Sequence, residues 1–88
     1  MKVVKITALW CSACLIMNKR WDEVLKEKEI ETISLDLDMD EEEVANYQVG
    51  DILPVFIFYK GDKEVRRIVG EKTTREMLAI IKEVEEAI

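Results

Sequence analysis

The only two cysteines of the chain, Cys11 and Cys14, stand three positions apart in the stretch WCSAC. On a helix, side chains at this spacing lie about 5–6 Å apart, which is within reach of disulfide geometry. A disulfide that closes so short a loop constrains the unfolded chain very little, so a purely structural role explains the pair poorly. The pair is therefore predicted to be redox-active or to bind a metal ion.

Cys11 is predicted to lie in the first turn of a helix that follows a strand. A helix N-terminus carries unpaired N–H groups and about half a positive charge, and both favour a thiolate over a thiol. The pKa of a cysteine in such a setting falls to roughly 3.5–7.5, from ~8.5 for a free thiol. Cys14 lies on the helix stripe expected to be buried. Cys11 is thus the candidate exposed nucleophile and Cys14 the shielded resolving thiol.

This assignment predicts a mechanism that needs no organic cofactor. The Cys11 thiolate attacks a disulfide in a client protein and forms a mixed disulfide with it. Cys14 then attacks the Cys11 sulfur, which releases the reduced client and leaves Cys11 and Cys14 oxidised. A second protein or a small thiol must recharge the pair.

A metal site is the main alternative. Tetrahedral zinc takes four ligands, and the chain has no other cysteine and no histidine, so a zinc site within one monomer is disfavoured. A zinc ion or iron–sulfur cluster shared by a symmetric dimer stays open. The lack of histidine excludes a Cys-His hydrolase.

The acidic run DLDMDEEE fails as a calcium loop, because Glu41 stands where glycine is needed and Tyr47 where a bidentate acid is needed. It is predicted to be a solvated strand end followed by an acidic helical turn.

Size and composition restrict the function classes. The 88 residues are expected to form one domain, residues 1–88, and 49% of them are hydrophobic, which is typical of a folded globular chain. A net charge of −6 argues against nucleic acid or an anionic membrane as the main partner. The longest apolar run, residues 52–59, contains Pro54 and is far shorter than the ~20 residues of a membrane span. No targeting segment is visible, so we expect a soluble, cytoplasmic monomer.

Hydrophobic periodicity predicts an α/β fold with the order β-α-β-α-β-β-α. Asp40 and Glu43 form a candidate capping box for a short helix, and a Gly61-Asp62 turn joins the last two strands. The long first helix requires a right-handed parallel connection, so we expect a four-stranded mixed sheet with the first strand central and helices on both faces. The predicted strands are residues 2–9, 30–38, 53–60 and 63–70; the predicted helices are 11–28, about 40–49, and a last helix capped by Thr73 or Thr74 that buries Met77, Ile80, Ile81, Val84 and Ile88.

Four segments together resemble the thioredoxin superfamily: WCSAC after a strand, ILP opening the third strand, KGDK at the hairpin turn, and VG ending the fourth strand. The resemblance covers essentially the whole chain. It differs at the start, because thioredoxins proper carry an extra strand and helix there, whereas nine residues precede Trp10. The length is therefore similar to that of a glutaredoxin, while the motif details resemble thioredoxin.

The resemblance implies roles for further residues. Trp10 matches the aromatic residue that shields the nucleophile and offers a docking surface, with ordinary packing as the alternative. Pro54 matches the family's cis-proline, which faces the cysteine pair, and the backbone of Leu53 would then pair with an extended client segment. Gly70, with Val69, matches the loop that completes the client groove, although a simple turn glycine is an equal alternative.

Two departures from the family pattern matter. Lys5 stands where thioredoxins place a buried aspartate that helps deprotonate the resolving thiol, and Ser34 stands where they place its companion lysine. A charged lysine would favour thiolates but could not accept a proton, so Lys5 is a candidate modulator of the cysteine pKa. The alternative is a lysine that extends to the edge of the sheet. The second departure is Ser12-Ala13 between the cysteines, where Gly-Pro is more usual.

The leading interpretation is a small thioredoxin-like dithiol–disulfide oxidoreductase that acts as a cytoplasmic reductant in electron transport and redox homeostasis. Its expected partners are disulfide-containing client proteins and a reductase or small thiol that recharges the pair, without a metal ion or organic cofactor. The competing interpretation is a non-catalytic module of the same fold that senses redox state or handles a metal.

Overall fold

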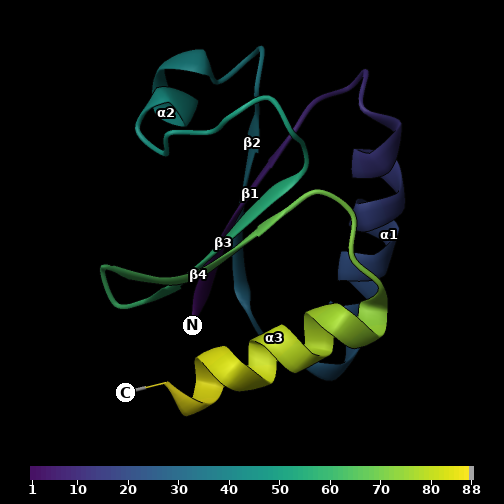
Figure 1. Cartoon of the computed structure of the whole chain (residues 1–88), viewed down its shortest axis with the longest axis vertical. Helices are drawn as coiled ribbons and strands as arrows, with labels where there is room; N and C mark the ends of the chain where they lie inside the picture. Colours follow the sequence, from purple (N-terminus) through teal and green to yellow (C-terminus); the bar gives the residue numbers. More distant parts are fainter. Residues whose placement is uncertain (88) are drawn as a thin grey trace.

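A four-stranded sheet forms the centre of the computed structural model, which describes residues 1–87 (Figure 1). Its strands follow the order β2-β1-β3-β4, with β2 parallel and β3 antiparallel to β1. The predicted element order, the mixed sheet and the inner position of the first strand are therefore confirmed. The elements are β1 (Lys2–Thr7), α1 (Ser12–Glu27), β2 (Glu31–Asp36), α2 (Glu41–Ala45), β3 (Val55–Lys60), β4 (Lys63–Val69) and α3 (Thr74–Glu86).

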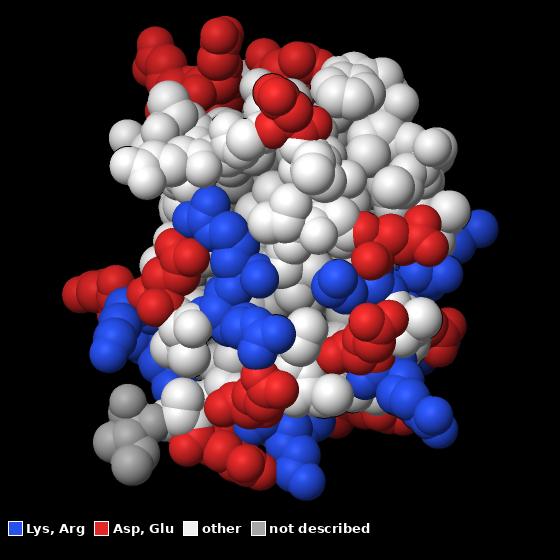
Figure 2. All heavy atoms as spheres, viewed as in Figure 1, with Lys and Arg blue, Asp and Glu red and all other residues white. Residues whose placement is uncertain are grey.

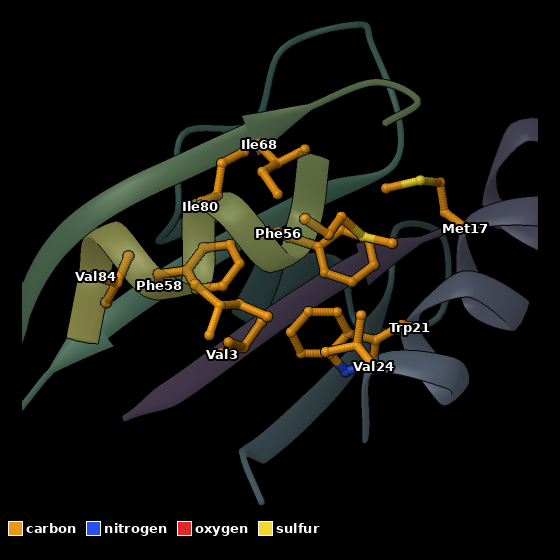
Figure 3. Packing of buried hydrophobic residues seen from close by; sticks show 11 residues of the cluster. Val3, Met17, Trp21, Val24, Phe56, Phe58, Ile68, Ile80 and Val84 are labelled. Carbon is orange, nitrogen blue, oxygen red and sulfur yellow. The ribbon is translucent and has the colours of Figure 1, made fainter. Parts of the chain in front are cut away.

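The two faces of the sheet carry different parts of the core. On one face, α1 and α3 pack against Val3 and the aromatic side chains of β3 (Figure 3). Trp21 of α1 lies against Phe56 and Phe58, with ring centroids 5.1 and 6.0 Å apart. Within β1, Val3 lies on this face and Val4 on the other, because alternate side chains of a strand point to opposite faces. Most of the core aromatic area is thus concentrated under the two long helices.

The opposite face is covered by α2 and the segment that leads from α2 to β3. Its buried cluster includes Ile6, Leu35, Val44 and both cysteines, so the Cys11–Cys14 pair is continuous with the core on this side. The cysteines follow directly after the C-terminal end of β1, where the chain leaves the sheet to form α1 (Figure 1). The sheet therefore fixes the position of the first cysteine through a short connection.

The predicted second helix is wrong in length and in its cap. The helix ends at Ala45 rather than near residue 49, and Asp40 at its N-cap makes no capping hydrogen bond. Instead, Oδ2 of Asp40 accepts a hydrogen bond from the backbone N–H of Asp36 at 2.8 Å. Short acidic side chains often bond to nearby backbone groups in this way, in competition with helix capping. The acidic run is therefore folded back on itself before the helix begins.

The last helix follows the prediction closely. Thr73 is its N-cap, and Thr73 and Glu76 form a reciprocal capping box in which each side chain accepts a backbone N–H of the other residue. The predicted stripe of Met77, Ile80, Ile81 and Val84 is buried, whereas its last member, Ile88, lies outside the described residues. None of the helices within residues 1–87 is long and apolar enough to cross a membrane.

Candidate active site

The cysteine pair lies at the N-terminus of α1, joined as a disulfide with Cα atoms 5.2 Å apart. Cys11 is the N-cap residue in an extended conformation, rather than a residue of the first helical turn as predicted. Its Sγ accepts a hydrogen bond from the backbone N–H of Cys14 at 3.1 Å, and its own N–H donates to the carbonyl of Ala8 at 3.2 Å. A cysteine sulfur thus occupies the place in which a serine or aspartate oxygen usually caps a helix.

Cys11 is buried rather than exposed as predicted, although it is the less buried of the two cysteines. Cys11 keeps 8% of its surface exposed, while Cys14 keeps 1%. Cys11 is therefore the only one of the two that a client could reach, although most of its surface is covered. A disulfide of another protein could therefore reach the Cys11 sulfur from only a small range of directions.

The predicted proline directly follows Leu53, a residue of this cluster. The Leu53–Pro54 peptide bond is cis, as the resemblance implied, and both residues are buried. Leu53 belongs to the same apolar cluster as Cys11 and Cys14. The backbone N–H of Gly70 donates to the carbonyl of Pro54 at 2.9 Å, so the end of β4 is fixed beside the proline.

Gly70 has a backbone conformation that favours glycine. Its φ of +86° is a left-handed conformation that side chains rarely adopt, and a Cβ there would lie 3.5 Å from Cγ2 of Ile52. Val69 directly before it is 45% exposed, and Ile52 is 59% exposed. The structure therefore brings Val69, Gly70 and the Leu53-Pro54 dipeptide together, with an exposed apolar side chain on each side.

Trp10 is 66% exposed, so its side chain is not part of the packed core. Its Nε1–H donates to Oδ2 of Asp38 at 2.8 Å, and this bond holds the indole beside the loop that precedes α2. Sequence reasoning missed Asp38, because it assigned the whole acidic run to solvent. Its spacing of 28 residues from Trp10 offers no local signal. The exposed apolar residues Leu9 and Met39 lie next to the two bonded residues and were missed for the same reason.

Lys5 lies on β1, an inner strand, opposite Ser34 of β2 and Phe56 of β3. The alternation of the strand places it on the face covered by α1, and the side chain is half-buried. This burial lowers the pKa of Lys5, while the negative charge of Asp22 on α1 partly offsets the effect. Asp22 lies on α1, about two helical turns after Cys14. Its effect on Lys5 agrees with a lysine side chain on the face of the sheet that α1 covers.

The acidic residues do not form a metal centre. Within residues 1–87, no group of three or more His, Cys, Asp or Glu side chains could hold a metal ion. The carboxylate of Asp36 instead accepts the backbone N–H groups of Asp38 and Met39 at 2.9 and 3.0 Å. These bonds shape the loop that carries Asp38 to Trp10.

A vicinal sulfur pair at a helix N-cap, one sulfur reachable and the other shielded, is arranged for thiol–disulfide exchange. Comparison with known proteins agrees with this chemistry. The family model described as "Thioredoxin" matches residues 1–83. The thioredoxin of Mycobacterium bovis is 31% identical over 84 residues, which cover 93% of this chain and 72% of that protein.

Solved structures give the same result. The thioredoxin of Fasciola hepatica superimposes with a TM-score of 0.79 at 34% identity, covering 92% of this chain and 78% of that one. A complex of ferredoxin:thioredoxin reductase with thioredoxin f2 matches the fold, with a TM-score of 0.82 at 21% identity over 97% of this chain and 77% of that one. The chain therefore belongs to the thioredoxin family, and it is a dithiol–disulfide oxidoreductase with Cys11 and Cys14 as its close cysteine pair.

Proposed function

We propose that this protein reduces disulfides of client proteins in the cytoplasm and is recharged by a reductase or a small thiol. The observation that carries the proposal is the hydrogen bond from the Cys14 N–H to Sγ of Cys11 at the N-cap of α1. In the reduced protein, the same N–H and the positive end of the helix would stabilise a thiolate at Cys11. A stabilised thiolate at neutral pH is the species that attacks a disulfide.

The reaction transfers two electrons from the protein to its client. The Cys11 thiolate forms an S–S bond to one client sulfur, and the second client sulfur leaves as a thiolate and takes up a proton. Cys14 loses its proton and attacks Sγ of Cys11, which breaks the mixed disulfide and releases the first client sulfur as a thiol. Cys11 and Cys14 are then oxidised. Two electrons and two protons from the recharging thiol or reductase return the pair to the dithiol.

The surroundings of the pair support a binding mode for the client. Among the backbone hydrogen bonds of the described residues outside helices and strands, none involves Leu53, so its N–H and C=O are available to an extended client segment. Such a segment would add along Leu53-Pro54 in the manner of an extra strand. Trp10 would contact it on one flank, and Val69 with Gly70 on the other. These five residues form the proposed client groove.

Lys5 is proposed as a positioning residue that acts on the cysteines through its charge. A positive charge beneath α1 favours ionisation of thiols at the start of that helix. Replacing the lysine by an acid (Lys5→Asp) should shift the pH profile of the disulfide-reduction rate to higher pH. An unchanged profile would show that the charge at Lys5 has no influence on the pair.

The partners are proposed from the chemistry of the pair. The related fold solved in complex with ferredoxin:thioredoxin reductase supports a reductase as the recharging partner, as part of electron transport and redox homeostasis. Residues 1–88 would act as a single monomeric domain without a resident cofactor, because the exchange uses only the two sulfurs. Metal analysis of the purified reduced protein by mass spectrometry tests this. Zinc or iron at one atom per two chains would instead favour a shared cluster.

The experiment that tests the function replaces each cysteine in turn. Cys11→Ser should abolish the reduction of insulin disulfides, and Cys14→Ser should trap a mixed disulfide with the client that is visible on a non-reducing gel. Activity that survives Cys11→Ser would contradict the assignment of the nucleophile. The reduction potential separates the two directions of exchange: about −270 mV suits a general reductant, whereas about −120 mV suits an oxidant.

A further inference from the structure

The charges of this chain are unevenly distributed along its sequence. Residues 29–59 carry nine Asp and Glu and no Lys or Arg, and residues 6–18 carry no charged side chain. All thirteen Lys and Arg therefore lie in the remaining segments. Figure 2 shows the result in space: acidic side chains border an uncharged surface at the top of the molecule, where α2 lies, whereas basic and acidic side chains are mixed over the lower part.

The acidic end of the molecule is not neutralised from within. The five ion pairs among residues 1–87 join residues of α1, its C-cap Lys28, β4, α3 and the segment before α3, and none involves residues 29–59. Asp36 and Asp40 bond to backbone N–H groups of their own loop, but Glu41, Glu42 and Glu43 are exposed on α2. These carboxylates are therefore free to attract a positively charged partner that docks on this surface.

This acidic surface adjoins the redox site on both flanks. On one flank, Asp38 is hydrogen-bonded to the Nε1–H of Trp10, next to Cys11, and an open hollow lined by residues 38–43 continues from it. On the other flank, Asp51 precedes Ile52 and Leu53 on the segment that leads to Pro54. Exposed apolar side chains lie between the two flanks. A partner bound over the disulfide would thus meet an apolar centre and an acidic rim.

We propose that this docking face selects polypeptides whose exposed disulfide is flanked by Lys or Arg residues. The proposal rests on the oxidoreductase function above, and it adds the class of client. Charges within about 8 Å of each other interact at physiological ionic strength, and complementary fields raise the rate of encounter by 10- to 1,000-fold in favourable cases. Apolar contacts at the centre hold a client of either charge, so the acidic rim supplies the discrimination.

The test uses the pre-reduced full-length protein and two synthetic peptides with one internal disulfide. The peptides are identical except that the residues flanking the cysteines are Lys in one and Glu in the other. We measure the second-order rate constant for oxidation of the protein by each peptide, and divide it by the rate of the same peptide with dithiothreitol to remove intrinsic reactivity. The Lys peptide should react about tenfold faster or more at 20 mM salt, and less than about threefold faster at 0.5 M salt.

Two matched variants locate the effect. The triple variant Glu41→Gln, Glu42→Gln, Glu43→Gln removes three charges from α2, and it should lower the Lys-to-Glu rate ratio several-fold. The control variant Glu27→Gln, Glu29→Gln, Glu86→Gln removes three exposed charges and has the same net charge. Glu29 belongs to the acidic segment by sequence, but it precedes β2 and so lies at the end of the sheet away from the cysteines. The rate ratio of this control variant at 0.15 M salt should stay within about twofold of that of the unmodified protein, because the Debye length is then about 8 Å, whereas α1 alone places Glu27 about 20 Å from the cysteine pair.

The outcomes separate this proposal from the function on which it rests. Equal normalised rates for the two peptides would overturn the client class while leaving the oxidoreductase function intact. An equal fall of the ratio in both triple variants would assign the preference to net charge and overturn the role of the acidic rim. If neither peptide oxidises the reduced protein, the oxidoreductase function itself is contradicted.

Discussion

The sulfur of Cys11 is subject to two opposing electrostatic effects. The Cys14 N–H reaches it directly at 3.1 Å, together with the positive end of a 16-residue helix, and both favour the thiolate. The exposed carboxylates around Asp38 act in the other direction, but through water and screened by salt. Direct donation by a partly buried N–H is the stronger effect, because solvent screens it least.

We therefore expect the Cys11 thiol of the reduced protein to ionise at lower pH than a free cysteine. Alkylation of the reduced protein by iodoacetamide, followed by mass mapping, should show modification of Cys11 well below pH 8 and little modification of Cys14. The midpoint of the Cys11 rate against pH gives its pKa. A midpoint at the free-cysteine value, about 8.5, would contradict the stabilisation of the thiolate by the helix N-terminus.

Lys5 gives a prediction for the pH dependence of stability. Because its pKa is lowered in the folded protein, folding penalises the charged form below that pKa. The penalty is lost as the pH rises through the folded pKa toward the ordinary value of 10.5, so the free energy of unfolding should rise over that window.

The variant Lys5→Met should raise the free energy of unfolding at pH 7 by at most about 1 kcal/mol, since water still reaches half of the side chain. The gain should vanish above pH 10.5. Urea unfolding at pH 7, 9 and 10.5 measures both effects, and Lys19→Met, at an exposed position of α1, serves as the control. A stability gain that is independent of pH would show that packing, rather than charge, is the cause.

At the scale of elements, local sequence rules predicted those helices and strands whose signals are local. The capping residue and buried stripe of α3 are set by spacings of three and four residues, which the sequence displays directly. The acidic run before α2 could not be resolved in this way, because the same aspartates can cap a helix or bond to the preceding loop, and tertiary contacts decide. Trp10 with Asp38 is a similar case, since its partners are distant in sequence.

The edge strand β2 shows the same limit. Ile33 and Leu35 share one face of the predicted strand, but Leu35 is buried while Ile33 remains exposed. Alternation identifies the side chains that share a face, whereas the extent of the covering segment decides which of them are buried. The client groove was accessible to sequence reasoning only through the family resemblance, because its parts come from three separate segments.

The capping box of α3 can be tested with adjacent threonines. Thr73→Ala should lower the free energy of unfolding by about 1 kcal/mol, because the first N–H groups of the helix lose their acceptor. Thr74→Ala, at the first helical position, should change it by less than about 0.5 kcal/mol. Thermal unfolding followed by circular dichroism compares the two variants. Equal losses would contradict the assignment of Thr73 as the N-cap residue.

At the scale of the whole molecule, the sheet separates the main packing of the fold from its chemistry. The aromatic cluster under α1 and α3 lies on one face, and the cysteine pair with its groove lies at the end of the other (Figures 1 and 3). Substitutions in the groove should therefore change rates more than stability. Substitutions in the aromatic cluster should do the opposite.

The two tryptophans test this separation. Trp21→Phe should lower the free energy of unfolding by about 2 kcal/mol, because it leaves a cavity beside Phe56 and removes the hydrogen bond to Thr32. Trp10→Phe should change stability by less than about 0.5 kcal/mol and should lower the rate of client reduction instead. Far-UV circular dichroism on heating measures the first effect and insulin reduction the second. A larger loss of stability from Trp10→Phe would contradict the separation.

A single guanidinium group holds down the longest irregular segment of the chain. Arg67 of β4 donates to the carbonyls of Tyr47 and Gln48 at 2.9 and 3.5 Å while it is paired with Glu64. The backbone that follows, up to Pro54, has no helix or strand of its own. We therefore expect Arg67 to protect this stretch from proteases. In its absence chymotrypsin should cut first at Tyr47, whereas the hydrogen bond from the Gly70 N–H to the Pro54 carbonyl would keep the proline at the start of β3.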